Sequence, residues 1–156
     1  MRTGVRLAID VGSVRIGVAR CDRDGVLASP LATVARGRGD LDSIARLAGD
    51  GQVIEIIVGL PTGLSGAEGA AAAAARDFAA RLAAHLGTVP VRLVDERLTT
   101  VIAHEALRQG GRDSRRRRPL VDRAAAALLL QGALDTERST GVPAGELVLS
   151  AQDERA

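Results

Sequence analysis

The amino-acid sequence predicts an α/β protein in which helices flank one five-stranded mixed sheet, with three antiparallel strands followed by parallel strands. The chain has 156 residues, of which 46% are hydrophobic, and this is enough to build the core of one compact domain. Its first third consists of short apolar, β-branched runs separated by turns, which is typical of an antiparallel meander. The following part alternates apolar runs with helix-like segments, which indicates strands joined by crossover helices.

The first three strands are expected at residues 5–10, 15–22 and 25–34. The sequence VGSV joins the first strand to the second, and DRDG joins the second to the third. Both connections are turn-forming sequences, so these strands should form hairpins with one another.

A helix and two more strands are expected next. Asp40 can cap a helix that continues to about Leu47, and residues 52–60 read as a fourth strand. The continuous apolar character of this fourth strand is typical of a strand covered on both faces of the sheet. Residues 88–96 form the fifth expected strand.

Three further helices are expected around and after the fifth strand. Ser65 and Glu68 have the S-x-x-E spacing of a capping box, which predicts the start of a long alanine-rich helix that Gly87 ends. The sequence TTVIAHEALRQ, which follows the fifth strand, predicts another helix. Pro119 suits the first turn of a last helix, which runs to about Glu137.

The chain is expected to hold one folded domain, residues 1–137, and a disordered tail, residues 138–156, because the tail mixes turn formers, small residues and charge. No apolar run approaches the roughly 18 residues of a membrane span, and the N-terminus does not read as a signal peptide. A cytoplasmic protein is expected. The single cysteine, Cys21, is expected to be a small buried side chain.

All 21 basic residues are arginines, and the formal net charge is +2. Residues 135–156 hold five of the acids and only two of the arginines, so the preceding part of the chain is more basic than the total suggests. This charge permits a polyanionic partner without requiring one.

Four acids occupy the positions at which a site of such a sheet would form. Asp10 ends the first strand, and Asp95 with Glu96 ends the fifth, so they should gather at the carboxyl edge of the sheet. Asp122 stands at the head of the last helix, on a helical face that should pack on the sheet and that continues with Ala126, Leu129 and Ala133.

Converging carboxylates repel one another unless a cation lies between them. Oxygen ligands alone favour Mg²⁺ or Mn²⁺, and a pair of such ions can support phosphodiester cleavage. Each acid also has a simpler explanation. Asp10 could make a turn, Asp122 could stabilise a helix N-terminus, and Asp95 or Glu96 could pair with Arg97.

Four motifs, in this order, then carry a resemblance: LAIDVGSVRIGVA, IIVGLPTGLSG, VDERLTT and VDRAAAALLLQ. They resemble the YqgF-type family of Holliday junction resolvases and pre-16S rRNA nucleases. The resemblance implies a ribonuclease H-like fold and a nuclease that depends on Mg²⁺ or Mn²⁺, with two ions expected. One departure is visible after GLP, where this chain has Thr62, Gly63 and Leu64 in place of the family's more polar residues.

The resemblance also implies roles for single residues. It makes Asp10, Glu96 and Asp122 the catalytic residues and the metal ligands. Strand alternation alone does not choose between Asp95 and Glu96, and Asp95 is expected to support the ligands from beside them. Apart from the resemblance, Thr99 is expected to start the following helix, and it is a second supporting candidate because a hydroxyl near the site could orient a phosphate.

A cluster of arginines directly precedes and enters the last helix, and it is the expected nucleic-acid contact. Its members are Arg108, Arg112, Arg115, Arg116, Arg117, Arg118 and Arg123. Guanidinium groups can hold phosphates without reading sequence, although such a loop can also be merely solvated. Phe78 is the only aromatic residue, so recognition by base stacking is not expected.

The expected function is 5′-end processing of pre-16S rRNA by hydrolysis of phosphodiester bonds, with structured RNA and a pre-ribosomal particle as partners. The first alternative is a Holliday junction resolvase acting on branched DNA. Two symmetric cuts would require a homodimer, whereas RNA trimming can work with a monomer. A non-catalytic nucleic-acid-binding or ribosome-assembly module is the alternative of another class. A nucleotide phosphotransferase is disfavoured because such enzymes close two domains of this kind around the nucleotide.

Overall fold

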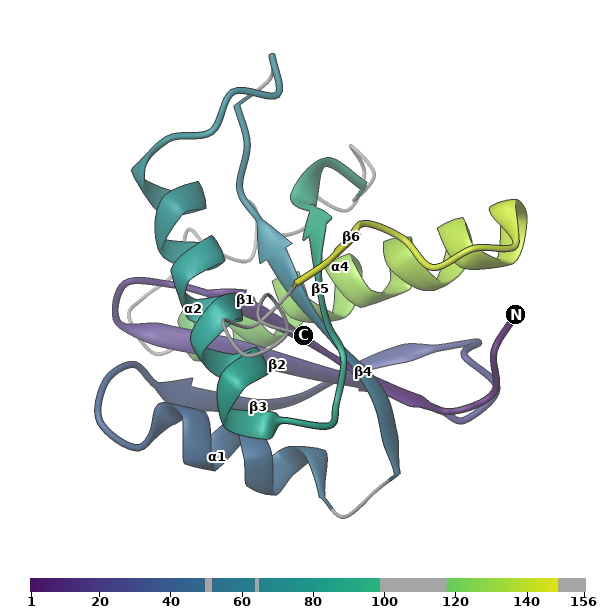
Figure 1. Cartoon of the computed structure of the whole chain (residues 1–156), viewed down its shortest axis with the longest axis horizontal. Helices are drawn as coiled ribbons and strands as arrows, with labels where there is room; N and C mark the ends of the chain where they lie inside the picture. Colours follow the sequence, from purple (N-terminus) through teal and green to yellow (C-terminus); the bar gives the residue numbers. More distant parts are fainter. Residues whose placement is uncertain (50–51, 64, 99–117, 149–156) are drawn as a thin grey trace.

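A computed structural model describes residues 1–49, 52–63, 65–98 and 118–148. One six-stranded sheet forms its centre, in the order β3-β2-β1-β4-β5-β6. Helices α1 and α2 cover one face of the sheet and α4 crosses the other (Figure 1). None of the helices in these ranges combines the length and the apolar character needed to cross a membrane.

The antiparallel part of the sheet agrees with the prediction. It consists of β1 (Val5–Val11), β2 (Arg15–Cys21) and β3 (Ala28–Ala35). Each strand pairs with the next through a short connection, as the turn sequences indicate.

The parallel part consists of β4 (Val53–Leu60), which pairs with β1, and β5 (Val91–Asp95), which pairs with β4. These strands contain the continuous apolar runs of the sequence, because helices cover them on both faces. The carboxyl ends of β1, β4 and β5 therefore share one edge of the sheet.

A sixth strand corrects the expectation of a disordered tail over residues 138–156. Helix α4 continues to Thr140, Ala144 is buried, and β6 (Glu146–Leu147) pairs antiparallel with β5. The Arg92 guanidinium donates to the carbonyl oxygens of Ala144 and Gly145, each at 3.0 Å, and so fixes this segment. Residues 149–156 lie outside the described ranges.

The described part of the chain contains four helical segments. They are α1 (Asp40–Ala48), α2 (Ala70–Leu86), the single 3₁₀ turn η1 (Glu96–Leu98) and α4 (Arg118–Thr140). The helix expected from TTVIAHEALRQ falls outside the described residues.

Both predicted side-chain caps are wrong. The cap of α1 is Gly39, at φ 87°, and Asp40 is the first helical residue, whose carboxylate accepts from the amides of Gly37 and Leu41. The cap of α2 is Gly69 and makes no side-chain hydrogen bond. The Glu68 carboxylate instead accepts two hydrogen bonds from the Arg76 guanidinium, at 2.6 and 2.8 Å.

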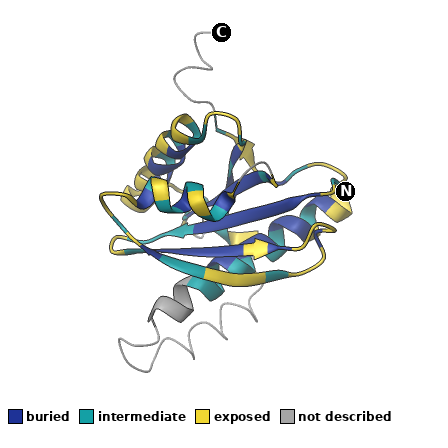
Figure 2. Ribbon diagram, turned by 90° about the horizontal axis from the view of Figure 1, so that it is seen from below, coloured by how far each residue is buried: buried dark blue, intermediate teal, exposed yellow. Residues whose placement is uncertain are grey.

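The core has two layers, one on each face of the sheet (Figure 2). The layer under α1 and α2 holds large side chains, among them Ile9, Ile16 and Phe78. The layer under α4 has smaller residues on the central strands, such as Ala8 and Ala19, and this allows α4 to lie close to the sheet. The single cysteine, Cys21, is buried in this second layer, as predicted.

A buried ionic cluster lies at the opposite end of the sheet from the carboxyl edge. Arg6 on β1 is completely buried, and its Nη2 donates to Oε2 of Glu137 on α4 at 2.9 Å. Arg2 donates to the other Glu137 oxygen at 2.6 Å and to Glu55 on β4 at 3.0 Å. The cluster therefore ties the N-terminus, two strands and the last turns of α4 together.

The pKa of Glu137 makes the stability of the fold depend on pH. Burial alone would raise this pKa, but the hydrogen bonds and charges of Arg2 and Arg6 outweigh burial and lower it below the ordinary value of 4.5. The ionised carboxylate thus stabilises the protein above pH 4.5, and this contribution is lost as pH falls through the lower native pKa.

We expect the free energy of unfolding, measured in urea from pH 7 to pH 3, to fall as the pH is lowered through the native pKa of Glu137. Glu137→Gln should flatten the dependence, and an unchanged slope would contradict this assignment.

Candidate active site

Asp10 lies at the carboxyl end of the central strand β1 and is half-buried. It points to the same face as Ala8, which packs under α4. Gly17 on β2 pairs directly with Asp10, and Gly59 stands one residue beyond the last paired residues of β4 and β1. Neither neighbour in the sheet presents a side chain, and Leu129 of α4 occupies the space beside Gly59, 3.0 Å from where a Cβ atom of residue 59 would lie.

The backbone after Asp10 turns sharply, and this explains the glycine of the motif. The Gly12 amide donates to the carbonyl oxygen of Arg15 at 2.8 Å. A Cβ atom at residue 12 would come within 2.6 Å of that oxygen, so a side chain there would break the turn. The Arg36 guanidinium closes it by donating to the Gly12 carbonyl oxygen at 2.8 Å.

Asp95 and Glu96, which strand alternation leaves equivalent, differ in the structure. Leu93 packs under α1 and α2 and Val94 under α4, so Asp95, the last residue of β5, points away from the face of Asp10. Glu96 begins η1, outside the regular alternation of the strand, and is half-buried.

The carboxylate of Asp95 is occupied by structural hydrogen bonds. It accepts from Thr62 Oγ1 at 3.1 Å, from the Arg97 amide at 2.8 Å and from the Arg97 guanidinium at 2.6 Å. The guanidinium hydrogen bond is the main reason why the pKa of Asp95 lies below its usual value, and burial opposes it. Asp95 thereby fastens η1, which carries Glu96, to the loop after β4. Thr62, at which the sequence departs from the family pattern, has this structural role.

The turn η1 also rests on α4, at Gly132. A Cβ atom at this position would lie 3.1 Å from the carbonyl oxygen of Leu98 and 3.3 Å from its Cβ. The glycine thus sets how closely η1 approaches the helix, and any shift of η1 moves Glu96.

We expect Gly132→Ala to lower activity several-fold with little change in the melting temperature. Alanine favours the helix by about 1 kcal/mol over glycine, and this offsets the crowding against Leu98. The check is to measure catalytic rate and thermal unfolding of the same preparation. An unchanged rate would mean that the position of η1 does not matter for activity.

The first turns of α4 lie over the part of the sheet that contains Asp10. Arg123 Nε donates to Thr33 Oγ1 at 2.7 Å, and Thr33 pairs with Gly17, the partner of Asp10. The predicted packing face of the helix is confirmed, since Ala126, Leu129 and Ala133 are buried against the sheet. Asp122 is in this helix, one turn before Ala126 and directly before Arg123.

Several predicted residues fall where the structure gives no side-chain description. Thr99 and the arginines from Arg108 to Arg117 lie outside the described residues, and Asp122 and Arg118 are described as part of α4 without their side chains. Among the described side chains, no group of three His, Cys, Asp or Glu residues is arranged to hold a metal ion. The set of Asp10, Glu96 and Asp122 therefore stays a prediction.

The donor chemistry at this edge fits a hard divalent cation. Asp10 and Glu96 are half-buried carboxylates at the carboxyl ends of β1 and β5. Carboxylate oxygens are the ligands that Mg²⁺ and Mn²⁺ prefer.

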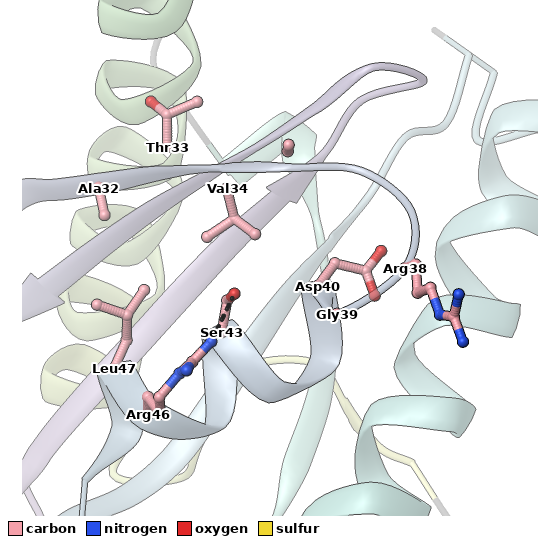
Figure 3. A pocket seen from close by; sticks show the side chains of 10 residues that line it. Ala32, Thr33, Val34, Arg38, Gly39, Asp40, Ser43, Arg46 and Leu47 are labelled. Carbon is pink, nitrogen blue, oxygen red and sulfur yellow. Dashed lines mark hydrogen bonds between the residues drawn. The ribbon is translucent and has the colours of Figure 1, made fainter.

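A separate hollow lies between β3 and α1 (Figure 3). Its lining includes Val34, Asp40, Ser43 and Arg46, and none of the predicted catalytic residues. Helix α1 and Asp10 are on opposite faces of the sheet, so this hollow is distinct from the candidate site.

Comparison with known proteins gives a consistent result. A family model described as "RuvX: Holliday junction resolvase" matches residues 4–136. A protein of Thermobifida fusca is 60% identical over 155 residues, which cover 95% of this chain and 98% of that protein. A protein of a Nocardioides species is 57% identical over 153 residues, with 95% and 98% covered. Both relatives carry the name "Putative pre-16S rRNA nuclease".

Among solved structures, T. thermophilus RuvC in complex with a Holliday junction substrate is similar in fold. The TM-score is 0.54 at 15% sequence identity, and the match covers 90% of this chain and 98% of that chain. The predicted ribonuclease H-like fold is thereby confirmed, with six strands in place of the expected five.

Proposed function

Because this chain belongs to the RuvX family, we propose that it is a nuclease that hydrolyses phosphodiester bonds in the 5′-end processing of pre-16S rRNA. The observation that carries the proposal is the place of Asp10. It ends the central strand, between two glycines and beneath the start of α4, at the edge where Glu96 also lies. Ligands of open α/β sheets bind beyond the carboxyl ends of the strands, and this supports a role for Asp10 in binding a cation.

In the proposed mechanism Asp10, Glu96 and Asp122 would hold the metal. Bound Mg²⁺ or Mn²⁺, two ions in our proposal, would supply an activated water and would stabilise charge on the attacking and leaving oxygens. Asp95 does not touch the reacting atoms but keeps η1, and with it Glu96, in place. The arginines from Arg108 to Arg118 and Arg123 would hold phosphates of the substrate.

The substrate and partners follow from this assignment. We propose structured RNA as the substrate and a pre-ribosomal particle in the cytoplasm as its setting. A monomer suffices for trimming an RNA end. Contacts to phosphates dominate such recognition, so binding should weaken steeply as salt rises.

Resolution of Holliday junctions is the second candidate. The description of the family favours it, and so does the similarity in fold to a RuvC bound to a junction. This activity would require a homodimer with two sites. A non-catalytic assembly module is the third candidate, since retained acids would bind metal with or without turnover.

The experiment is a cleavage assay of the purified protein with Mn²⁺ or Mg²⁺, with EDTA as the control. A precursor 16S rRNA leader and a four-way DNA junction are offered in the same salt. We expect metal-dependent cutting of the RNA. Cutting of the junction alone would replace the proposal with the resolvase, and cutting of neither by folded protein would leave the assembly module.

A further inference from the structure

Arg36 makes hydrogen bonds to the turn that follows Asp10. The Arg36 amide donates to the carbonyl oxygen of Val14 at 2.9 Å. Its Nη1 donates to the carbonyl oxygen of Gly12 at 2.8 Å. Arg36 thus binds both sides of the turn, and one of the residues that it contacts, Gly12, follows Asp10 by two positions in the sequence.

The Arg36 side chain is itself held in place. Its exposed fraction is 23%, and its guanidinium carbon lies 5.4 Å from the centre of the Phe78 ring on α2. Its Nε is 4.0 Å from Oδ2 of Asp40, which is 6% exposed and fixed by the Gly37 and Leu41 amides. Figure 3 shows Asp40 at the start of α1, beside the loop that follows β3. The guanidinium is therefore a rigid support and not a solvated surface charge.

Arg36 and the Asp10 carboxylate lie on opposite faces of the sheet. Phe78 and Ile44 of α1 belong to the layer under α1 and α2, whereas Asp10 points to the α4 side with Ala8. Arg36 can therefore act on Asp10 only through the backbone of the turn. A nucleic-acid strand bound at Asp10 would not touch it.

We propose that Arg36 is a positioning residue that fixes the direction of the Asp10 carboxylate by clamping the turn after β1. The inference rests on the proposed function, because it gives Asp10 the role of a metal ligand. An arginine is required because its planar group donates to the Gly12 carbonyl while its face covers the Phe78 ring. A lysine can make one of these contacts but not both.

The chain offers a matched control in Arg81. Its guanidinium carbon lies 5.5 Å from the centre of the same Phe78 ring, but its ion pair among the described residues is with Asp77 on its own helix and not with the turn. Arg36→Ala and Arg81→Ala therefore remove the same kind of ring contact, and only the first releases the turn.

The first measurement is hydrogen–deuterium exchange of the Gly12 and Arg36 amides, together with the melting temperature. We expect these amides to exchange about tenfold faster or more in Arg36→Ala, because a hydrogen bond from a charged donor is lost. Exchange in Arg81→Ala should equal that of the wild type. If Arg36→Ala does not fold, Arg36→Lys replaces it, with a smaller increase in exchange.

The second measurement is the affinity for Mn²⁺ alone, by calorimetry, beside cleavage of the preferred substrate. We expect Arg36→Ala to bind Mn²⁺ about 10-fold to 100-fold more weakly, which is the usual effect of removing a group that orients a ligand. Its kcat should fall while KM for the nucleic acid stays unchanged, and Arg36→Lys should recover part of the loss.

The two measurements separate this inference from the proposed function. Equal exchange and equal Mn²⁺ affinity in Arg36→Ala and Arg81→Ala would overturn the inference even if the wild type is an active nuclease. Faster exchange with weaker Mn²⁺ binding would support it even if no tested substrate is cut. A wild type that binds no Mn²⁺ would overturn it outright.

Discussion

Asp10→Asn is expected to lower the rate of cleavage by more than about 100-fold, which is the upper range for residues that only support a metal ligand. The amide keeps the shape of the carboxylate but removes its charge. Asp10 is fixed by the central strand and flanked by Gly17 and Gly59, so no other side chain from these two strands can replace it. Because the amide has the same size, β1 should pack between β2 and β4 as in the wild type.

The measurement is cleavage under single-turnover conditions, with Asp24→Asn as the matched control. Asp24 lies exposed in the turn between β2 and β3, at the end of the sheet away from the site, so the control makes the same chemical change there. Nucleic-acid binding by Asp10→Asn in EDTA should equal that of the wild type or exceed it, since a repelling charge is gone. Wild-type cleavage by this variant, in a preparation free of contaminating nuclease, would remove Asp10 from the mechanism.

Glu137→Ala is expected to lower the free energy of unfolding by about 3–5 kcal/mol, the usual cost of leaving a buried charge without its partner. Arg6 has no exposed surface, and the carboxylate with which it forms an ion pair among the described residues is that of Glu137. Arg2 would also lose its 2.6 Å hydrogen bond, although it keeps Glu55. Most of the cost therefore comes from Arg6.

Urea unfolding at pH 7 measures this effect, and Asp135→Ala is the control. Asp135 lies half a turn before Glu137 on α4 and pairs with Arg138 at 3.3 Å, but both side chains are exposed. Exposed pairs contribute about 0–1 kcal/mol. If the free energy of unfolding fell equally in the two variants, burial of the Arg6–Glu137 pair would have no energetic consequence.

The strands could be predicted from the sequence because their signal is local. Apolar runs and turn sequences lie next to one another, and β1 to β5 follow them within a few residues. The two predicted caps failed because the side chains found partners elsewhere. Glu68 pairs with Arg76 in the second turn of α2, and Asp40 binds the loop before its own helix.

The missed features depend on contacts between distant parts of the chain. Strand β6 has only two residues, both exposed, and its place is fixed by its pairing with β5 and by the hydrogen bonds of Arg92, about 50 residues earlier, to the segment before it. Arg6 reads as an ordinary polar residue within a strand, and its partner lies 131 residues later. Neither has a signal that periodicity could detect.

Part of the candidate site could be predicted from the sequence. Position at a strand end predicts the place of Asp10, and helical spacing predicts the buried face of α4. Alternation could not separate Asp95 from Glu96, because the strand ends between them and the chain turns into η1. The different roles of the two acids follow from the hydrogen bonds that Thr62 and Arg97 donate to Asp95, and these contacts cannot be predicted from the sequence pattern.

The late position of α4 in the chain has a consequence for synthesis on the ribosome. This helix packs on β1, β2 and β3, which come from the first 35 residues, yet it begins only at Arg118. During translation the face of the sheet that contains the small residues Ala8 and Ala19 stays exposed to solvent until α4 has left the exit tunnel. An incomplete nascent chain therefore carries Asp10 without the helix that covers it. Nuclease activity would appear only after α4 has been synthesised and has packed on the sheet.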